Sequence, residues 1–173
     1  VSTSSLEALR LYTRAVRAQA AGEAIDRVSL LQQAVTLDSN FAMAWRALYI
    51  DLNNLGGDQA LIADAITRTY NLRDHLPAHE ALLAEAAYST YQGDFDRSIE
   101  VYRRIVASWP DDTRARNNLG HDLRTFGRYE EAEQVLSALV VSGLASASAF
   151  YNLITTQIPL GRADEARQTL LLL

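Results

Sequence analysis

Two of the three histidines in this chain stand at a spacing that suits a metal ion. His75 and His79 are four residues apart, which on one helix would place both imidazoles on the same face. Pro77 lies between them, however, and a proline at an interior position breaks a helix. We therefore expect His75 in a turn and Pro77 near the start of the next helix, and we predict no metal site.

The remaining reactive residue types do not form a catalytic pattern. The chain has no cysteine, and all 16 basic residues are arginine, which excludes thiol nucleophiles, Schiff-base lysines and the lysine of phosphate-binding loops. Serines occur without a Gly-x-Ser-x-Gly or Ser/His/Asp setting. Three carboxylate clusters stand at the starts of expected helices: Asp94 with Asp96, Asp111 with Asp112, and Glu130 with Glu131. Helix capping explains these clusters, so we predict no catalytic residue, no cofactor and no enzyme activity.

Composition favours an ordered, soluble protein. Of the 173 residues, 49% are hydrophobic and 21% are charged, so the chain can bury enough apolar surface to fold. The net charge of −5 argues against a nucleic-acid partner, because phosphate binding needs a basic surface. No run approaches the roughly 20 apolar residues that span a bilayer, so direct membrane insertion is not expected.

Glycines punctuate the sequence at nearly even intervals. They fall at Gly22, Gly56-Gly57, Gly93, Gly127 and Gly161, with steps of 34 residues between the last three. Gly and Pro are otherwise scarce, and Ala, Leu, Arg, Glu and Gln fill the intervals, which favours helix throughout. A period of 34 residues is typical of solenoids built from helix–turn–helix repeats.

Small residues recur in register with the glycines. Gly120 and Ala132 occupy the eighth and twentieth places of one repeat, and Ala86 and Ser98 occupy those places in the repeat before it. Small side chains at these places let the two helices of a repeat approach closely. Trp45 and Leu48 add the Trp-x-x-Leu that opens such repeats.

On these residues the chain resembles a tetratricopeptide repeat (TPR) protein over nearly its whole length. The resemblance implies one all-α domain, 1–173, a right-handed superhelical solenoid of antiparallel helix pairs. Its repeats would span 8–41, 42–78, 79–112 and 113–146, with a partial fifth at 147–173. The first repeat departs from the pattern, because Arg27 stands where a small residue is expected. The second carries about three extra residues, since Gly56-Gly57 is doubled and the segment 72–76 lengthens the exit from its second helix.

A narrower resemblance rests on the phrases at 5–13, 37–45, 72–76 and 109–112. They are similar to TPR regions attached to bacterial serine/threonine kinases and to some bacterial transcriptional regulators. This resemblance implies a regulatory part of a larger bacterial signalling protein. It would lie in the bacterial cytoplasm or form an extracytoplasmic segment of a membrane-anchored kinase. Nothing in the chain itself matches a kinase motif.

In the TPR family, the first helices of the repeats line a concave groove that binds peptides. At the groove-facing places the N-terminal repeats carry mainly apolar residues, among them Leu9, Tyr12 and Met43. The polar residues expected to bind a peptide there are Arg114, Asn117, Asn118, His121, Arg124, Tyr151, Asn152, Thr155, Arg46 and Asn53.

Two kinds of contact are expected from these polar residues. Asn118 and Asn152 hold the same place in consecutive repeats, and an amide can bond both the C=O and the N–H of a peptide backbone. Arg114, His121 and Arg124 suit a carboxylate or an acidic side chain. The alternative is that the asparagines belong to the repeat pattern and that the charges are ordinary solvated surface.

We therefore predict a non-enzymatic module that binds a protein or peptide segment. The alternative is an accessory domain that recruits substrate to a kinase or transferase whose catalytic domain is absent from this chain. A third idea, a small-molecule sensor, would need a closed pocket between repeats. Pro159 is expected to end the helix before it. At least one or two of the four final leucines should face outward and contact another copy or a following helix.

Overall fold

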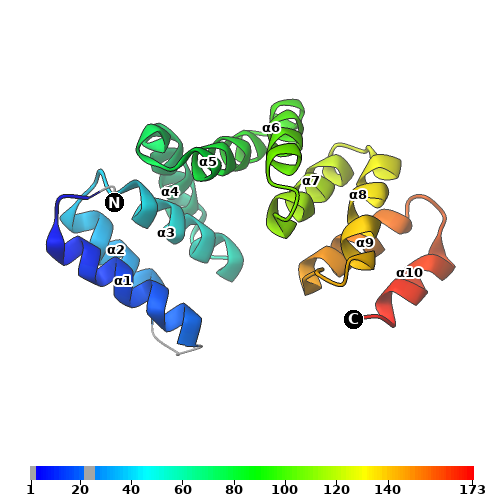
Figure 1. Ribbon diagram of the computed structural model, residues 1–173, viewed down its shortest axis with the longest axis horizontal. Helices are drawn as coiled ribbons and strands as arrows, with labels where there is room; N and C mark the ends of the chain where they lie inside the picture. The colour runs from blue at the N-terminus through cyan, green and yellow to red at the C-terminus, as the bar shows by residue number, and fades with distance from the viewer. Residues whose placement is uncertain (1–2, 22–25) are drawn as a thin grey trace. The chain divides into compact units, whose positions relative to one another are not determined.

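The computed structural model describes residues 3–21 and 26–173, and within them the chain is helical without any β-strand (Figure 1). Gly22, which was expected to turn the first repeat, lies outside the described residues. The chain divides into two compact units, an N-terminal unit (Val1–Tyr88) and a C-terminal unit (Ser89–Leu173).

The N-terminal unit holds the first two helix pairs and the start of the third. Its elements are α1 (Leu6–Ala21), α2 (Arg27–Leu37), α3 (Ala42–Leu55), α4 (Gln59–Asn71), the 3-10 helix η1 (Arg73–His75) and most of α5 (Ala78–Tyr91). Helix α1 packs on α2, α2 on α3, and α3 on α4. Each of the predicted repeats 8–41 and 42–78 therefore contains one helix pair.

The C-terminal unit continues the same pattern after the end of α5. It contains α6 (Phe95–Ser108), α7 (Thr113–Thr125), α8 (Tyr129–Val141), α9 (Ala147–Gln157) and α10 (Ala163–Leu170). Successive helices pack on one another, and α7 also contacts α9 (Figure 1). The expected all-α arrangement of helix pairs is confirmed for the described residues.

Local signals in the sequence set the ends of these helices. The periodic glycines Gly93, Gly127 and Gly161 adopt φ values of 76°, 81° and 74°, a left-handed conformation that glycine adopts without strain. The carboxylates of Asp94 and Asp112 accept hydrogen bonds from the Arg97 and Ala115 N–H groups at 3.1 and 2.9 Å. The predicted turns and N-caps are therefore confirmed at these positions.

Both prolines discussed above act at helix ends. Pro77 lies directly before α5, where its carbonyl accepts the N–H of Ala81 at 2.8 Å, and His75 lies in η1. Helix α9 ends at Gln157, two residues before Pro159, which confirms the predicted termination.

Arg27, which departs from the repeat pattern, is accommodated by a partner in the next repeat. Its Nη1 lies 3.1 Å from Oδ1 of Asp51 in α3, and its Nε donates to the Ala15 carbonyl at 3.1 Å. Asp51 is buried, and burial raises the pKa of its carboxyl group while the Arg27 charge opposes that rise. An ion pair thus fills a position that the repeat pattern reserves for a small residue.

A close helix contact in the C-terminal unit depends on a residue without a side chain. Gly120 lies in α7, and a Cβ built there would lie 2.5–2.9 Å from three side-chain carbons of Leu136 in α8. Leu136 and the neighbouring Ala132 are both fully buried, so a shift of Leu136 would displace other core side chains. The expected small residues at these two places therefore set the spacing between α7 and α8.

We predict that Gly120→Ala destabilises the protein. Overpacking a full core costs about 1–3 kcal/mol, which exceeds the helix-propensity gain of about 0.5–1 kcal/mol, so we expect a net loss of about 1 kcal/mol or more. Urea unfolding followed by circular dichroism measures this loss. Leu136→Ala should cost less in the Gly120→Ala background than in the wild type, and strictly additive costs would contradict the contact.

Candidate functional site

One face of α7 carries most of the polar residues that were expected to bind a peptide. The face begins at Arg114 and continues three, four, seven and ten residues later with Asn117, Asn118, His121 and Arg124. This spacing keeps the five side chains on one side of the helix. We call these five residues the α7 face. Arg114 is exposed and the other four are partly exposed, so each side chain can be reached from solvent.

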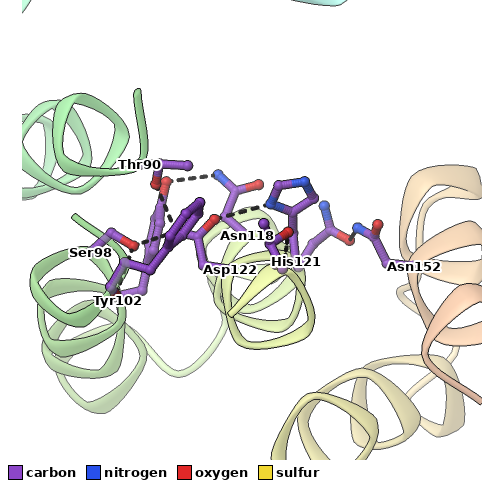
Figure 2. A network of polar contacts seen from close by, with 10 residues as sticks. Thr90, Ser98, Tyr102, Asn118, His121, Asp122 and Asn152 are labelled. Carbon is purple, nitrogen blue, oxygen red and sulfur yellow. Dashed lines mark hydrogen bonds and ion pairs between the residues drawn. The ribbon is translucent and has the colours of Figure 1, made fainter. Parts of the chain in front are cut away.

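A buried carboxylate beside this face joins α7 to its neighbours (Figure 2). Asp122 is 1% exposed, and its Oδ2 accepts hydrogen bonds from Thr90 Oγ1 in α5 at 2.6 Å and from Ser98 Oγ in α6 at 2.5 Å. Its Oδ1 lies 3.0 Å from Nδ1 of His121. Hydrogen bonds to a carboxylate are stronger than neutral ones, so Asp122 holds α7 and the imidazole of His121 in place.

The asparagines of the site are engaged within the fold. Asn152 in α9 is 6% exposed and its Nδ2 donates to Oδ1 of Asn117 at 3.0 Å, while Nδ2 of Asn118 donates to the Tyr102 hydroxyl at 3.2 Å. Asn118 and Asn152, which hold the same place in consecutive repeats, were both expected to bind a peptide backbone. In the structure, Asn152 instead links α9 to α7. Asn118 is partly exposed, and its Oδ1 accepts no hydrogen bond from the described residues.

The two arginines of the α7 face are not neutralised. Neither Arg114 nor Arg124 makes an ion pair with any described residue, and the buried Nε of Arg124 has no hydrogen-bond acceptor there. By contrast, Arg103 and Arg128 both pair with Glu131, and Arg162 pairs with Glu133. Both side chains reach solvent, so their guanidinium groups can donate charge-assisted hydrogen bonds to an incoming carboxylate.

The other expected residues lie in different settings. Tyr151 in α9 is 64% exposed, and the Thr155 hydroxyl donates to the Tyr151 carbonyl at 2.8 Å. Arg46 and Asn53 lie on α3 in the N-terminal unit. Asn53 is exposed, but Nη2 of Arg46 lies 2.6 Å from Oε2 of Glu80, and only 13% of the Arg46 side chain is exposed. The charge of Arg46 is therefore used within the fold.

Asp122 was not among the residues expected at the site, and the hydrogen bonds that Thr90 and Ser98 donate to it were not predicted from the sequence. Ser98 was assigned only the role of a small residue at the twentieth place of its repeat. The missed signal is an Asp at an inward-facing place of a helix, because a buried carboxylate requires donors from neighbouring elements.

Other kinds of site are not found in the described residues. No group of three or more His, Asp or Glu side chains among them could hold a metal ion. None of the helices described is both long enough and apolar enough to cross a membrane.

Comparison with known proteins connects this fold to a family. A family model described as "Tetratricopeptide repeat" matches residues 83–143 and 117–173. "Cellulose synthase 2 operon protein C" of Komagataeibacter xylinus is 29% identical over 142 residues, covering 80% of this chain. The matched part is only 11% of that protein, so this chain corresponds to a small part of its length.

Solved structures share the fold at low sequence identity. MamA from Desulfovibrio magneticus RS-1 is 17% identical with a TM-score of 0.63, covering 97% of this chain and 93% of that one. PilW, a type IV pilus biogenesis factor, is 12% identical with a TM-score of 0.58, covering 96% and 91%. YrrB, described as a TPR protein with an unusual peptide-binding site, is 17% identical with a TM-score of 0.56, covering 95% and 84%.

We predict that Asp122→Ala strongly destabilises the protein. Two hydroxyl groups would lose a charged acceptor, and each such hydrogen bond contributes about 1.5–3 kcal/mol, so the loss should be about 3 kcal/mol or more. Thermal unfolding followed by circular dichroism measures it. The control is Asp111→Ala, which removes an exposed carboxylate and should change stability by less than about 0.5 kcal/mol. Equal effects of the two substitutions would contradict the role of Asp122.

Proposed function

The chain belongs to the tetratricopeptide repeat family, and from this premise we propose that it is a non-enzymatic interaction module whose α7 face binds an acidic peptide segment. The observation that carries the proposal is the pair of unneutralised guanidinium groups, Arg114 and Arg124, on one face of one helix. A carboxylate partner would complete their hydrogen bonds, and Arg can bind it through two parallel N–H donors.

Amide side chains on the same face can bind the backbone of the peptide. The Oδ1 atom of Asn118 is available to accept a peptide N–H, and Asn152 keeps Asn117 in position rather than binding the peptide itself. Tyr151, next to Asn152 in the sequence, is 64% exposed. YrrB, which shares the fold, is described as having a peptide-binding site, which supports the class of ligand.

In this proposal the module serves a larger bacterial protein as its partner-binding part. The resemblance to repeats attached to kinases and transcriptional regulators supports a role in signalling. The bacterial relative is much longer than the part that this chain matches, which supports a place for the module within a larger bacterial protein.

Replacing both arginines tests the α7 face. We expect Arg114→Gln with Arg124→Gln to weaken a fluorescein-labelled acidic peptide, Gly-Asp-Glu-Gly-Asp-Glu-Gly, about tenfold or more, because at least one charge-assisted contact is lost. Fluorescence anisotropy at low salt measures the dissociation constant. The control variant, Arg17→Gln with Arg104→Gln, removes two exposed arginines elsewhere. If both double variants weaken binding equally, only net charge matters and the α7 face is not the site.

Self-association through the C-terminal edge is the second part of the proposal. Helix α10 ends at Leu170, and Leu170, Leu171, Leu172 and Leu173 are 58%, 86%, 67% and 66% exposed. Burying such a side chain is worth about 1.5–3 kcal/mol, which favours contact with a second copy. Light scattering at high concentration should therefore show a dimer that Leu171→Ser with Leu172→Ser converts to a monomer. A wild-type monomer at every concentration would contradict this part alone.

A further inference from the structure

The last helix pair exposes two repeat places that are buried in the pair before it. Leu136 and Leu139 hold the twenty-fourth and twenty-seventh places of their repeat and are fully buried in α8, which packs on α7 and on α9. Leu170 and Leu173 hold the same places 34 residues later and are largely exposed. The C-terminal edge therefore presents apolar side chains at places that lie in the core of the preceding repeat.

Three of the later first helices meet the preceding repeat through one side. Their third, seventh and tenth places are all buried, and they hold Ala44, Leu48 and Asp51 in α3, Ala115, Leu119 and Asp122 in α7, and Ala149, Leu153 and Thr156 in α9. These places are spaced by four and three residues, so they lie on one side of the helix. That side faces the preceding repeat, because Asp51 pairs with Arg27 there and Asp122 accepts a hydrogen bond from Ser98 there.

Helix α1 carries arginine at the same three places. Arg10, Arg14 and Arg17 are all exposed. Laying this side of α1 on the leucines of another copy would bury three guanidinium groups against an apolar surface, which is unfavourable unless carboxylates pair with them. The outer side of α1 is therefore unsuited to cover the C-terminal edge in the way that α9 covers α8.

The C-terminal edge can meet an identical edge without charge repulsion. Residues 170–173 are all leucine and carry no side-chain charge. On the exposed side of α10, Asp164 and Arg167 neutralise each other, with Oδ1 and Nη1 3.2 Å apart. A surface that is apolar and locally neutral is complementary to itself.

We propose that the C-terminal edge binds the same edge of a second copy, so that the protein forms a closed two-fold dimer and not a head-to-tail chain of copies. This inference rests on the self-association proposed above and adds which surface of the second copy is met. A two-fold contact places residues 170–173 of one copy against those of its partner. Both edges are then used, so assembly stops at two copies. The contact needs no residue of α1 and none of the α7 face.

Sedimentation velocity over a concentration series separates a closed contact from an open one. We expect the dimer of the 173-residue chain to remain the largest species as the concentration rises. A wild-type monomer at every concentration would refute the self-association on which the inference rests. Species that grow beyond the dimer with concentration would leave self-association standing and overturn the closed contact alone.

Cross-linking identifies the two surfaces that meet. The chain has no cysteine, so a single introduced thiol reports a single contact. Gln168→Cys changes an exposed residue of α10 and keeps all four leucines, and with bismaleimidoethane we expect it to form covalent dimers by itself. The matched control on α1, Arg14→Cys, should form none. A product that appears only when the two variants are mixed, or a sedimenting dimer that Gln168→Cys does not cross-link, would overturn the proposal.

Substitution of the α1 arginines tests why copies do not stack head to tail. The triple variant Arg10→Ala, Arg14→Leu, Arg17→Thr copies the three places of α9, and we expect it to form species larger than a dimer. The control, with all three arginines changed to Gln, removes the same charge without adding an apolar side to α1 and should remain a dimer. Equal behaviour of the two triple variants would show that the arginines do not close the assembly.

Discussion

The position of α7 depends on one buried carboxylate. Asp122 has hardly any contact with water, so its charge must be satisfied by donors from the protein, and Thr90 and Ser98 supply them from two other helices. The same carboxylate contacts the imidazole of His121. One buried side chain thus orients both the helix and one of the side chains on its outer face. The acidic residues nearest in sequence to the two arginines of that face are both engaged within the fold: Asp122, near Arg124, accepts from Thr90 and Ser98, and Asp112, near Arg114, accepts from the Ala115 N–H.

Features that arise within one repeat could be predicted from the sequence. The turn glycines, the capping carboxylates Asp94 and Asp112, and the small residue at Gly120 each depend on neighbours within a few residues or on the partner helix of the same repeat. The 34-residue period places those neighbours at fixed offsets, so residue type alone indicates their roles.

Features that join different repeats could not be predicted in this way. Asn152 bonds to Asn117, 35 residues earlier, and Arg46 meets Glu80 in the next repeat. The repeat pattern says which face of a helix a residue occupies, but not whether a residue on the adjacent helix will use its polar atoms. The pattern therefore predicted which helix face the candidate residues share, but not which of their polar atoms are already bonded within the fold.

The pairing of Arg27 with Asp51 has a consequence for how this array of repeats can change over evolution. Solenoids commonly grow and shrink by duplication or loss of single repeats, because each repeat contacts mainly its neighbours. Here the first repeat supplies the cation and the second supplies the anion. A recombination event that separated them would leave a lone buried charge, at a cost of about 3–5 kcal/mol. The first two repeats are therefore expected to be inherited as a pair.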